Sequence, residues 1–272
     1  MDAIRLSRPD LTTELVTMKT SGDRILDRPL EAIGGKGLFI KELHEALQDR
    51  RVDVCVHSYK DMPVPDDPEL PVVAVVRRED PRDVLILPPG ADAIPAGRPI
   101  GTSSPRRRLQ LSRLFPGRAC EPVRGNVATR LRKLDAGEFG ALVLAAAGIK
   151  RLGLWERVHS VFDADEMIPA ACQGTLAVQG RAGEDYSWLA DVDDDDARDA
   201  SRAERSFVET LGATCASPVA AYARVAGSEL RLSGLYVDGA GKFSRGVRIG
   251  DRTRAQAIGA ELARELKESG HA

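Results

Sequence analysis

The sequence predicts an α/β protein with two α/β domains and a smaller α+β domain at the carboxyl end. Strand-like apolar runs alternate with helix-like segments through the first two-thirds of the 272 residues, which predicts mostly parallel sheets covered by helices. The polar, proline-containing stretch 79–83 reads as a crossing between two domains. After the acidic run 193–196, one helix and three consecutive strand-like segments follow. This length suits two or three domains.

Each domain has its expected elements. In the first we expect strands at 14–18, 52–56 and 72–76, and a helix that opens at the glycine-rich segment 34–37. In the second we expect strands at 84–87, 120–123 and 141–145, a helix after Gly101 and a helix at 127–134. In the third we expect a helix at 197–211, strands at 219–224, 229–237 and 243–249, and a final helix capped by Asp251.

The acidic run 193–196 has two interpretations, a cation site or the beginning of the helix that follows it. The second is favoured, because acidic residues stabilise the first turn of a helix.

Composition excludes several classes of function. The net charge of −2 argues against a bulk nucleic-acid binder, and no apolar run approaches the roughly 20 residues that span a bilayer. The four cysteines form no CxxC pair and no zinc-type spacing, so no metal site is expected, and reduced thiols in a cytoplasmic protein are favoured. Arginines nevertheless gather at 106–108 and 124–132, which favours a small acidic ligand.

Three strand-to-helix joints carry anion-binding chemistry. In the joint 101–107, Ser104 suits a helix N-cap and Pro105 the first helical position, and Arg106 and Arg107 follow at once. Free backbone N–H groups at a helix start attract anions, and a guanidinium can hold both oxygens of a carboxylate. The joints 124–130 and 34–37 have the same plan.

Each joint alone could be a capped helix with solvated arginines, but three on consecutive α/β units favour a cleft for a multiply charged carboxylate. Lys60 and Asp61 end a hydrophobic strand. They could bind a ligand and handle a proton, or form a surface ion pair that contributes little.

Taken together, these segments resemble the porphobilinogen deaminase (hydroxymethylbilane synthase) family. The similar stretches occur in the family's order at 22–30, 34–43, 56–64, 78–83, 101–107, 124–134, 147–153, 169–174 and around Cys215. The resemblance implies two periplasmic-binding-protein-like α/β domains, at 1–78 with 174–192 and at 82–170, and a third domain at 197–272. It also implies that an amino-terminal strand and helix of the first domain are missing from this chain.

The resemblance implies an enzyme, a transferase that condenses four porphobilinogen molecules head to tail into hydroxymethylbilane and releases ammonia. This reaction belongs to tetrapyrrole (haem) biosynthesis and takes place on a dipyrromethane cofactor, which a thioether would attach to Cys215. A cytoplasmic monomer is expected, with no nucleic-acid or membrane partner.

Site residues follow from the same resemblance. Asp61 is the implied catalytic carboxylate, which contacts pyrrole N–H groups and stabilises positive charge on the ring. The implied cofactor-binding residues are Cys215, Lys60, Asp61, Thr102, Ser103, Ser104, Arg106, Arg107, Arg124, Arg130 and Gly148. The implied substrate-binding residues are Arg106, Arg124, Arg130, Arg151 and Gln173.

Two alternatives remain at this stage. A non-catalytic binding protein for a small dicarboxylate would use the same arginine joints. An inactive paralogue of the deaminase would keep the fold alone. Ala213 and Thr214 stand where the family usually has glycine before the cofactor cysteine.

Overall fold

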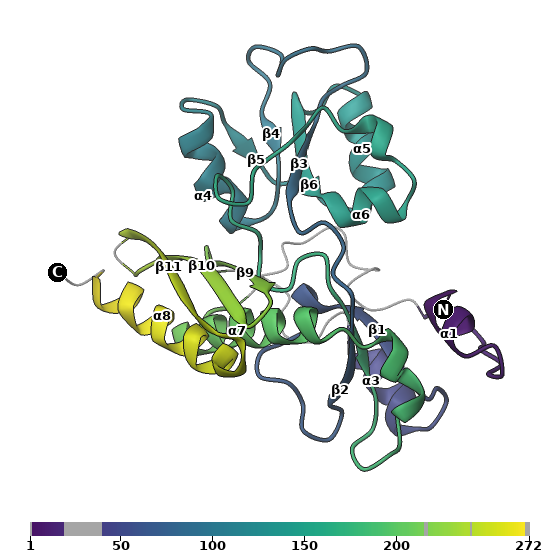
Figure 1. The fold of residues 1–272 in the computed structure, drawn as a ribbon. Helices are drawn as coiled ribbons and strands as arrows, with labels where there is room; N and C mark the ends of the chain where they lie inside the picture. Colours follow the sequence, from purple (N-terminus) through teal and green to yellow (C-terminus); the bar gives the residue numbers. More distant parts are fainter. Residues whose placement is uncertain (1, 19–39, 215–216, 240, 270–272) are drawn as a thin grey trace.

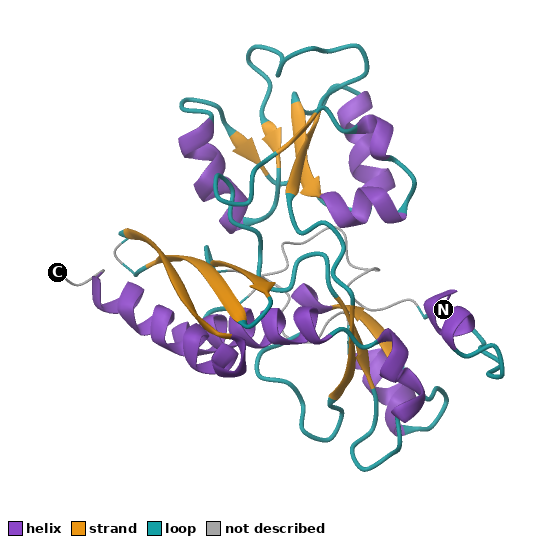
Figure 2. Ribbon diagram, in the orientation of Figure 1, coloured by secondary structure: helices purple, strands orange, loops and turns teal. Residues whose placement is uncertain are grey.

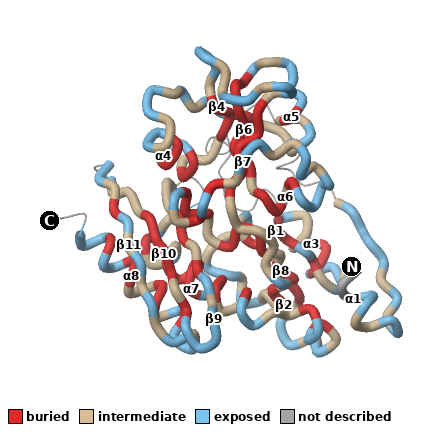
Figure 3. The backbone as a smooth tube through the Cα atoms, turned by 45° about the horizontal axis from the view of Figure 1, so that its top comes forward, coloured by how far each residue is buried: buried red, intermediate tan, exposed pale blue. Residues whose placement is uncertain are grey.

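The computed structural model describes residues 2–18, 40–214, 217–239 and 241–269. Within these ranges the strands form three sheets. In Figure 1 the sheet with β1 and β2 lies at the lower right, the sheet with β3 to β6 at the top, and the sheet with β9 to β11 at the lower left. Helices flank the sheets (Figure 2), and buried residues concentrate along the strands and on the inner faces of the helices (Figure 3). No helix of the described ranges is long and apolar enough to cross a membrane.

The first sheet has the order β1-β8-β2. Both outer strands pair antiparallel with β8, which the chain supplies only after it has built the second sheet. A small core under this sheet includes Leu47, Cys55 and Leu70. The elements are α1 (Asp2–Ser7), α3 (Lys41–Gln48), β1 (Cys55–Ser58), η2 (Tyr59–Asp61), β2 (Val72–Val76), β8 (Leu176–Gln179) and η4 (Ser187–Val192).

The second sheet has the order β5-β4-β6-β3-β7. Strand β4 runs parallel to both of its neighbours, whereas β3 runs antiparallel to β6 and β7. Apolar side chains fill both faces, because Val84 and Ile86 join one core cluster and Leu85 joins another. The elements are β3 (Asp83–Ile86), β4 (Ile100–Gly101), α4 (Pro105–Leu114), β5 (Cys120–Glu121), α5 (Val127–Asp135), β6 (Ala141–Ala145), α6 (Ala146–Arg151), η3 (Trp155–Arg157) and β7 (Ser160–Val161).

The third sheet is an antiparallel meander in the order β11-β10-β9, covered by α7 and α8. The Asp194 side chain caps α7 by accepting from Ala197 N at 2.8 Å, and the helix ends at Gly212 in the left-handed conformation. The acidic run is therefore a helix start, as the favoured interpretation predicted. The elements are α7 (Asp195–Leu211), β9 (Ala220–Ala226), β10 (Glu229–Val237), β11 (Phe243–Asp251), η5 (Arg252–Arg254) and α8 (Ala255–Ser269).

Two expectations about strands were wrong. The sheets are not mostly parallel: among the described strands, only the pairs that β4 makes with β5 and β6 are parallel. The reason is that β8, which returns from the second unit, inserts between two strands of the first and runs against both. Residues 14–18 form no strand. Asp251 caps η5, by accepting from Thr253 N, rather than the final helix itself.

Two segments cross between the first two units, one before β3 and one before β8. They pass so close that Glu79 N donates to Gly174 O at 3.2 Å. Gly174 has a φ of 89°, and a Cβ there would lie 2.4 Å from Glu79 O, so only glycine fits. Arg78 ties this crossing to α7, because its Nη1 donates to Glu204 Oε1 at 2.6 Å. The crossing point thus fixes the base of the region that holds the predicted site residues.

Candidate functional site

Two of the three predicted anion-binding joints lie in the described part of the chain. Ser104 caps α4 by accepting from Arg107 N at 3.4 Å, and Pro105 takes the first helical position, as predicted. Asn126 caps α5 by accepting from Thr129 N at 2.9 Å. The third joint, at 34–37, lies outside the described residues.

Arg106 and Arg107 are buried and share one carboxylate. Arg106 Nη1 donates to Asp83 Oδ2 at 2.7 Å and to Ile168 O at 2.8 Å. Arg107 Nε and Nη2 donate to Asp83 Oδ1 at 3.0 and 2.8 Å. Burial alone would raise the pKa of Asp83, but the two guanidiniums outweigh it and hold that pKa well below its usual range. These arginines, expected to face carboxylates of a ligand, thus already share a carboxylate of the protein.

Arg124 and Arg130 extend the positive charge from the second joint. Gly125 between them has a φ of 107°, and its carbonyl accepts from Arg130 Nε at 2.7 Å. Burial first, and then the positive charges of Arg107 and Arg124, lower the pKa of Arg130 to about 10, while Asp61 acts in the opposite direction. Arg107, Arg124 and Asp61 therefore lie within electrostatic range of Arg130.

Lys60 and Asp61 lie in the short helix η2, directly after β1. Asp61 is exposed and Lys60 is half-buried. Burial lowers the pKa of Lys60. The charges of Arg107 and Arg106 lower it too, whereas those of Asp61 and Asp83 act in the opposite direction. Charged residues from two α/β units therefore lie within electrostatic range of Lys60.

Side-chain hydrogen bonds fix the backbone beside this cluster. Ser103 Oγ donates to Val123 O at 2.8 Å and accepts from Val123 N at 3.1 Å, so it joins the two arginine-bearing joints. Thr102 is buried, and its Oγ1 accepts from Ser104 N at 3.3 Å. Both predicted residues therefore hold the loop before α4 in place.

The remaining predicted residues lie near the crossing segments. Arg151 Nη2 donates to Gly174 O at 2.8 Å, and Gln173 Nε2 donates to Asp83 Oδ1 at 2.9 Å. A Cβ built on Gly148 would meet no atom of the described residues within 4 Å, so there is open space beside this glycine. The structure brings Gln173 into the Asp83 cluster, whereas Arg151 joins the crossing backbone.

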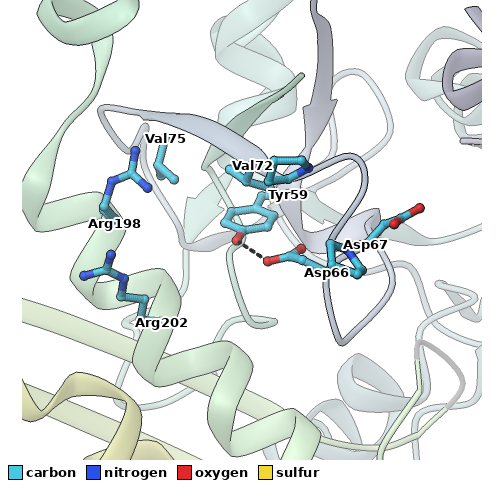
Figure 4. Close-up of a pocket in the computed structure, with 9 residues that line it drawn as sticks. Tyr59, Asp66, Asp67, Val72, Val75, Arg198 and Arg202 are labelled. Carbon is cyan, nitrogen blue, oxygen red and sulfur yellow. Dashed lines mark hydrogen bonds between the residues drawn. The ribbon is translucent and has the colours of Figure 1, made fainter. Parts of the chain in front are cut away.

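The turn that carries Asp61 is fixed from behind by Tyr59. The Tyr59 ring is buried against Arg205, whose guanidinium carbon lies 4.6 Å from the ring centre, and its hydroxyl donates to Asp66 at 3.3 Å. Figure 4 shows this hydrogen bond at the edge of a pocket between the 66–75 region and the α7 residues Arg198 and Arg202. This packing restricts the position of η2.

The predicted cofactor cysteine, Cys215, lies outside the described residues. Beside it, Thr214 N donates to Ser217 Oγ at 3.0 Å in the loop after α7. Burial raises the pKa of Cys172 to about 12 and that of Cys55 to about 11. Neither thiol is suited to alkylation by a bulky ligand, because a reactive cysteine needs access and thiolate character.

The sequence patterns assigned no role to Asp83. This acid ends the similar stretch 78–83 and begins a buried strand. A carboxylate there requires a charge partner, and this was the available signal. Nothing local in the sequence, however, pairs Asp83 with residues 23 and 24 positions away.

The fold and this cluster define a class of protein, an α/β protein whose buried arginines suit small ligands that carry several carboxylates. Comparison with protein families is more specific. Residues 2–187 match the family model described as "Porphobilinogen deaminase, dipyromethane cofactor binding domain", and residues 199–268 match "Porphobilinogen deaminase, C-terminal domain". The chain belongs to the porphobilinogen deaminase family.

Individual relatives agree with this assignment. The chain is 53% identical over 266 residues to the porphobilinogen deaminase of Acetivibrio thermocellus, covering 98% of this chain and 91% of the relative. It is 45% identical over 273 residues to that of Roseiflexus castenholzii, covering 99% and 90%. Among solved structures, the periplasmic VFT2 domain of Bordetella pertussis BvgS matches 70% of this chain and 72% of its own, with 16% identity and a TM-score of 0.37.

Proposed function

We propose that this chain condenses four porphobilinogen molecules head to tail into hydroxymethylbilane, with release of ammonia, as a transferase of tetrapyrrole (haem) biosynthesis. The observation that carries the proposal is the exposed Asp61 carboxylate, which follows Lys60 in η2 and acts electrostatically on Arg130, as Arg107 and Arg124 also do. Family matches over both parts of the chain do not favour the alternative of a non-catalytic dicarboxylate binder.

The residues present fit a dipyrromethane cofactor. Its acetate and propionate groups require several cations, and the cluster supplies one lysine and four arginines. Arg106 Nε is buried without a hydrogen-bond partner among the described residues, and the pKa of Arg130 is lowered, as expected where a negatively charged ligand would add stabilisation. When bound through Cys215, the cofactor supplies the pyrrole on which the chain grows.

Each group of residues has a proposed role in binding. Arg106, Arg107, Arg124, Arg130 and Lys60 hold carboxylate side chains, because guanidinium and ammonium groups donate charge-assisted hydrogen bonds. Thr102, Ser103 and Ser104 fix the loop that presents these arginines, and the open space beside Gly148 allows a ring to approach the backbone. Arg151 and Gln173 connect substrate binding to the crossing segments.

Asp61 has the proposed catalytic role. Its carboxylate accepts a hydrogen bond from the pyrrole N–H of bound porphobilinogen and offsets the positive charge that develops on the ring nitrogen. A fixed negative charge at that point lowers the barrier, since it needs no reorganisation during the reaction.

We also propose the finer properties that the sequence indicated. The domains are 1–78 with 174–192, 82–170 and 197–272, and the protein acts as a monomer in the cytoplasm. Support for a reducing compartment comes from Cys55, Cys120 and Cys172, which are free thiols in the structure. Sedimentation velocity at micromolar concentration tests the monomer, which a stable dimer peak would contradict.

The Asp61→Ala variant tests the catalytic role. We expect turnover of porphobilinogen to fall on the order of 10²- to 10³-fold, while the far-UV circular dichroism spectrum stays unchanged. Asp53→Ala is the matched control, because Asp53 lies on the same unit with its side chain 93% exposed. Full activity of Asp61→Ala, or an equal loss in the control, would contradict the role.

A further inference from the structure

Asp83 is the point at which three separate elements meet. It begins β3 and is fully buried. Its Oδ2 accepts from Arg106, and its Oδ1 accepts from both Arg107 and Gln173, which come from α4 and from the crossing segment before β8. A single carboxylate therefore joins the arginine joint to the crossing between the two units.

This arrangement fixes the orientation of Arg107. Two of its nitrogens, Nε and Nη2, face Asp83, and the third, Nη1, donates to Val143 O at 3.0 Å. With all three nitrogens engaged, the guanidinium plane has one orientation. Arg106 is restrained in a similar way by Asp83 and by Ile168 O. The remaining donor positions of both arginines are thereby directed by protein contacts.

Asp83 also changes the charge of the cluster. Lys60, Arg106, Arg107, Arg124 and Arg130 carry five positive charges, against which Asp61 and Asp83 provide two negative ones. Without Asp83, the two buried guanidiniums would face each other and Lys60 without a counter-ion, and like charges in a buried place repel strongly. The carboxylate keeps the arginines together.

We propose that Asp83 is a positioning residue of the reaction: through Arg106 and Arg107 it sets how tightly the site holds the carboxylates of porphobilinogen. This inference rests on the proposed function. Asp83 acts through the arginines and does not itself meet the substrate. Gln173 shares Asp83 Oδ1 and supports the same arrangement from the crossing segment.

Two other effects of Asp83 would give different results. If its charge mattered only by sum, removing it would leave one more net positive charge, and porphobilinogen would bind more tightly. If it were only a structural ion pair, the variant would lose stability without any change in the KM of the folded enzyme. Positioning predicts a higher KM, because the released guanidiniums no longer lie where the carboxylates need them. The direction of the change in KM therefore separates the three.

The experiment compares steady-state kinetics and urea unfolding of the cofactor-loaded wild type, Asp83→Asn and Glu204→Gln. Glu204 is the matched control, because it too is fully buried and accepts from an arginine. We expect Asp83→Asn to raise KM for porphobilinogen by about tenfold or more, which corresponds to the loss of one charge-assisted hydrogen bond. The change in kcat should be smaller. Glu204→Gln should lose stability and keep the wild-type KM.

Asp83→Glu keeps the charge but displaces it by one methylene. If Asp83→Asn does not fold, this variant tests the positioning role instead. Its KM should rise about threefold, less than the tenfold given for a full hydrogen bond. An unchanged or lower KM in the folded variants would overturn the inference, as would an equal rise in Glu204→Gln. Failure of the proposed function would look different, because the wild type itself would not consume porphobilinogen.

Discussion

Replacing Arg78 by leucine would leave the carboxylate of Glu204 buried without its charge partner. Arg78 Nη1 lies 2.6 Å from Glu204 Oε1, and the side chains are 12% and 0% exposed. Arg78 Nε also donates to Gln173 O at 2.8 Å, so the same guanidinium holds the crossing segment. The variant thus removes one ion pair and the hydrogen bonds to Gln173 O and Ala223 O at the base of the site.

The structure indicates the size of the effect. Breaking a buried ion pair by removing one partner costs about 3–5 kcal/mol, since an uncompensated charge remains. Glu204 keeps two backbone donors, Cys172 N at 2.5 Å and Ala223 N at 2.6 Å, which places the expected loss at the lower end, about 3 kcal/mol. In the Arg78→Leu/Glu204→Gln double variant no charge is left unpaired, so the two losses should not add and the coupling should be about 1–3 kcal/mol.

Urea unfolding of the wild type, both single variants and the double variant gives the double-mutant cycle that measures this coupling. The m-value is compared first, because a constant m-value permits the midpoints to be read as changes in stability. A loss below about 1 kcal/mol in Arg78→Leu is the size of a solvated surface pair and would refute the reasoning. So would additivity of the two single variants, since it would mean that the groups do not interact.

Two further predictions concern the cluster and the pH. Arg130→Gln should raise KM for porphobilinogen by about tenfold or more, since a charge-assisted hydrogen bond is lost. The control is Arg132→Gln, because Arg132 is exposed on the same helix, and its KM should stay unchanged. Equal effects of the two substitutions on KM would contradict the assignment. Burial and the charge of His44 lower the pKa of His57 from 6.5 to about 4, so the unfolded chain binds the extra proton between these values. The free energy of unfolding should therefore fall as pH falls from 6.5 to about 4, by up to about 1.4 kcal/mol per pH unit. In His57→Gln, the urea midpoint should depend less on pH in this window. An identical slope in the wild type and the variant would count against this prediction.

Local sequence signals predicted the elements that present the site. Ser104 with Pro105 marked the start of α4, and the apolar runs at 72–76 and 141–145 matched β2 and β6 residue for residue. These features depend on caps and on short apolar stretches, which adjacent residues determine. The strand expected at 52–56 is Cys55–Ser58, because pairing with β8 selects the more polar end of the run.

Pairings between residues far apart in the chain could not be predicted from these local signals. The first sheet depends on β8, which comes from much later in the chain and inserts between β1 and β2. The pairing of Arg106 with Asp83 depends on how α4 lies against β3. Local patterning therefore predicted that Arg106 and Arg107 stand at a helix start, but not that Asp83 already accepts from them. The same holds for Gln173, whose amide donates to Asp83 Oδ1 across the crossing segments.

Intact-protein mass spectrometry, followed by peptide mapping, tests the central claim most directly. Purified protein incubated with porphobilinogen should carry one covalent dipyrromethane, and the modified peptide should contain Cys215. Cys215→Ser should show no such gain, and Cys172→Ser should load normally, since Cys172 is buried with a raised pKa. An unmodified Cys215 in folded protein, or attachment at another cysteine, would contradict the account.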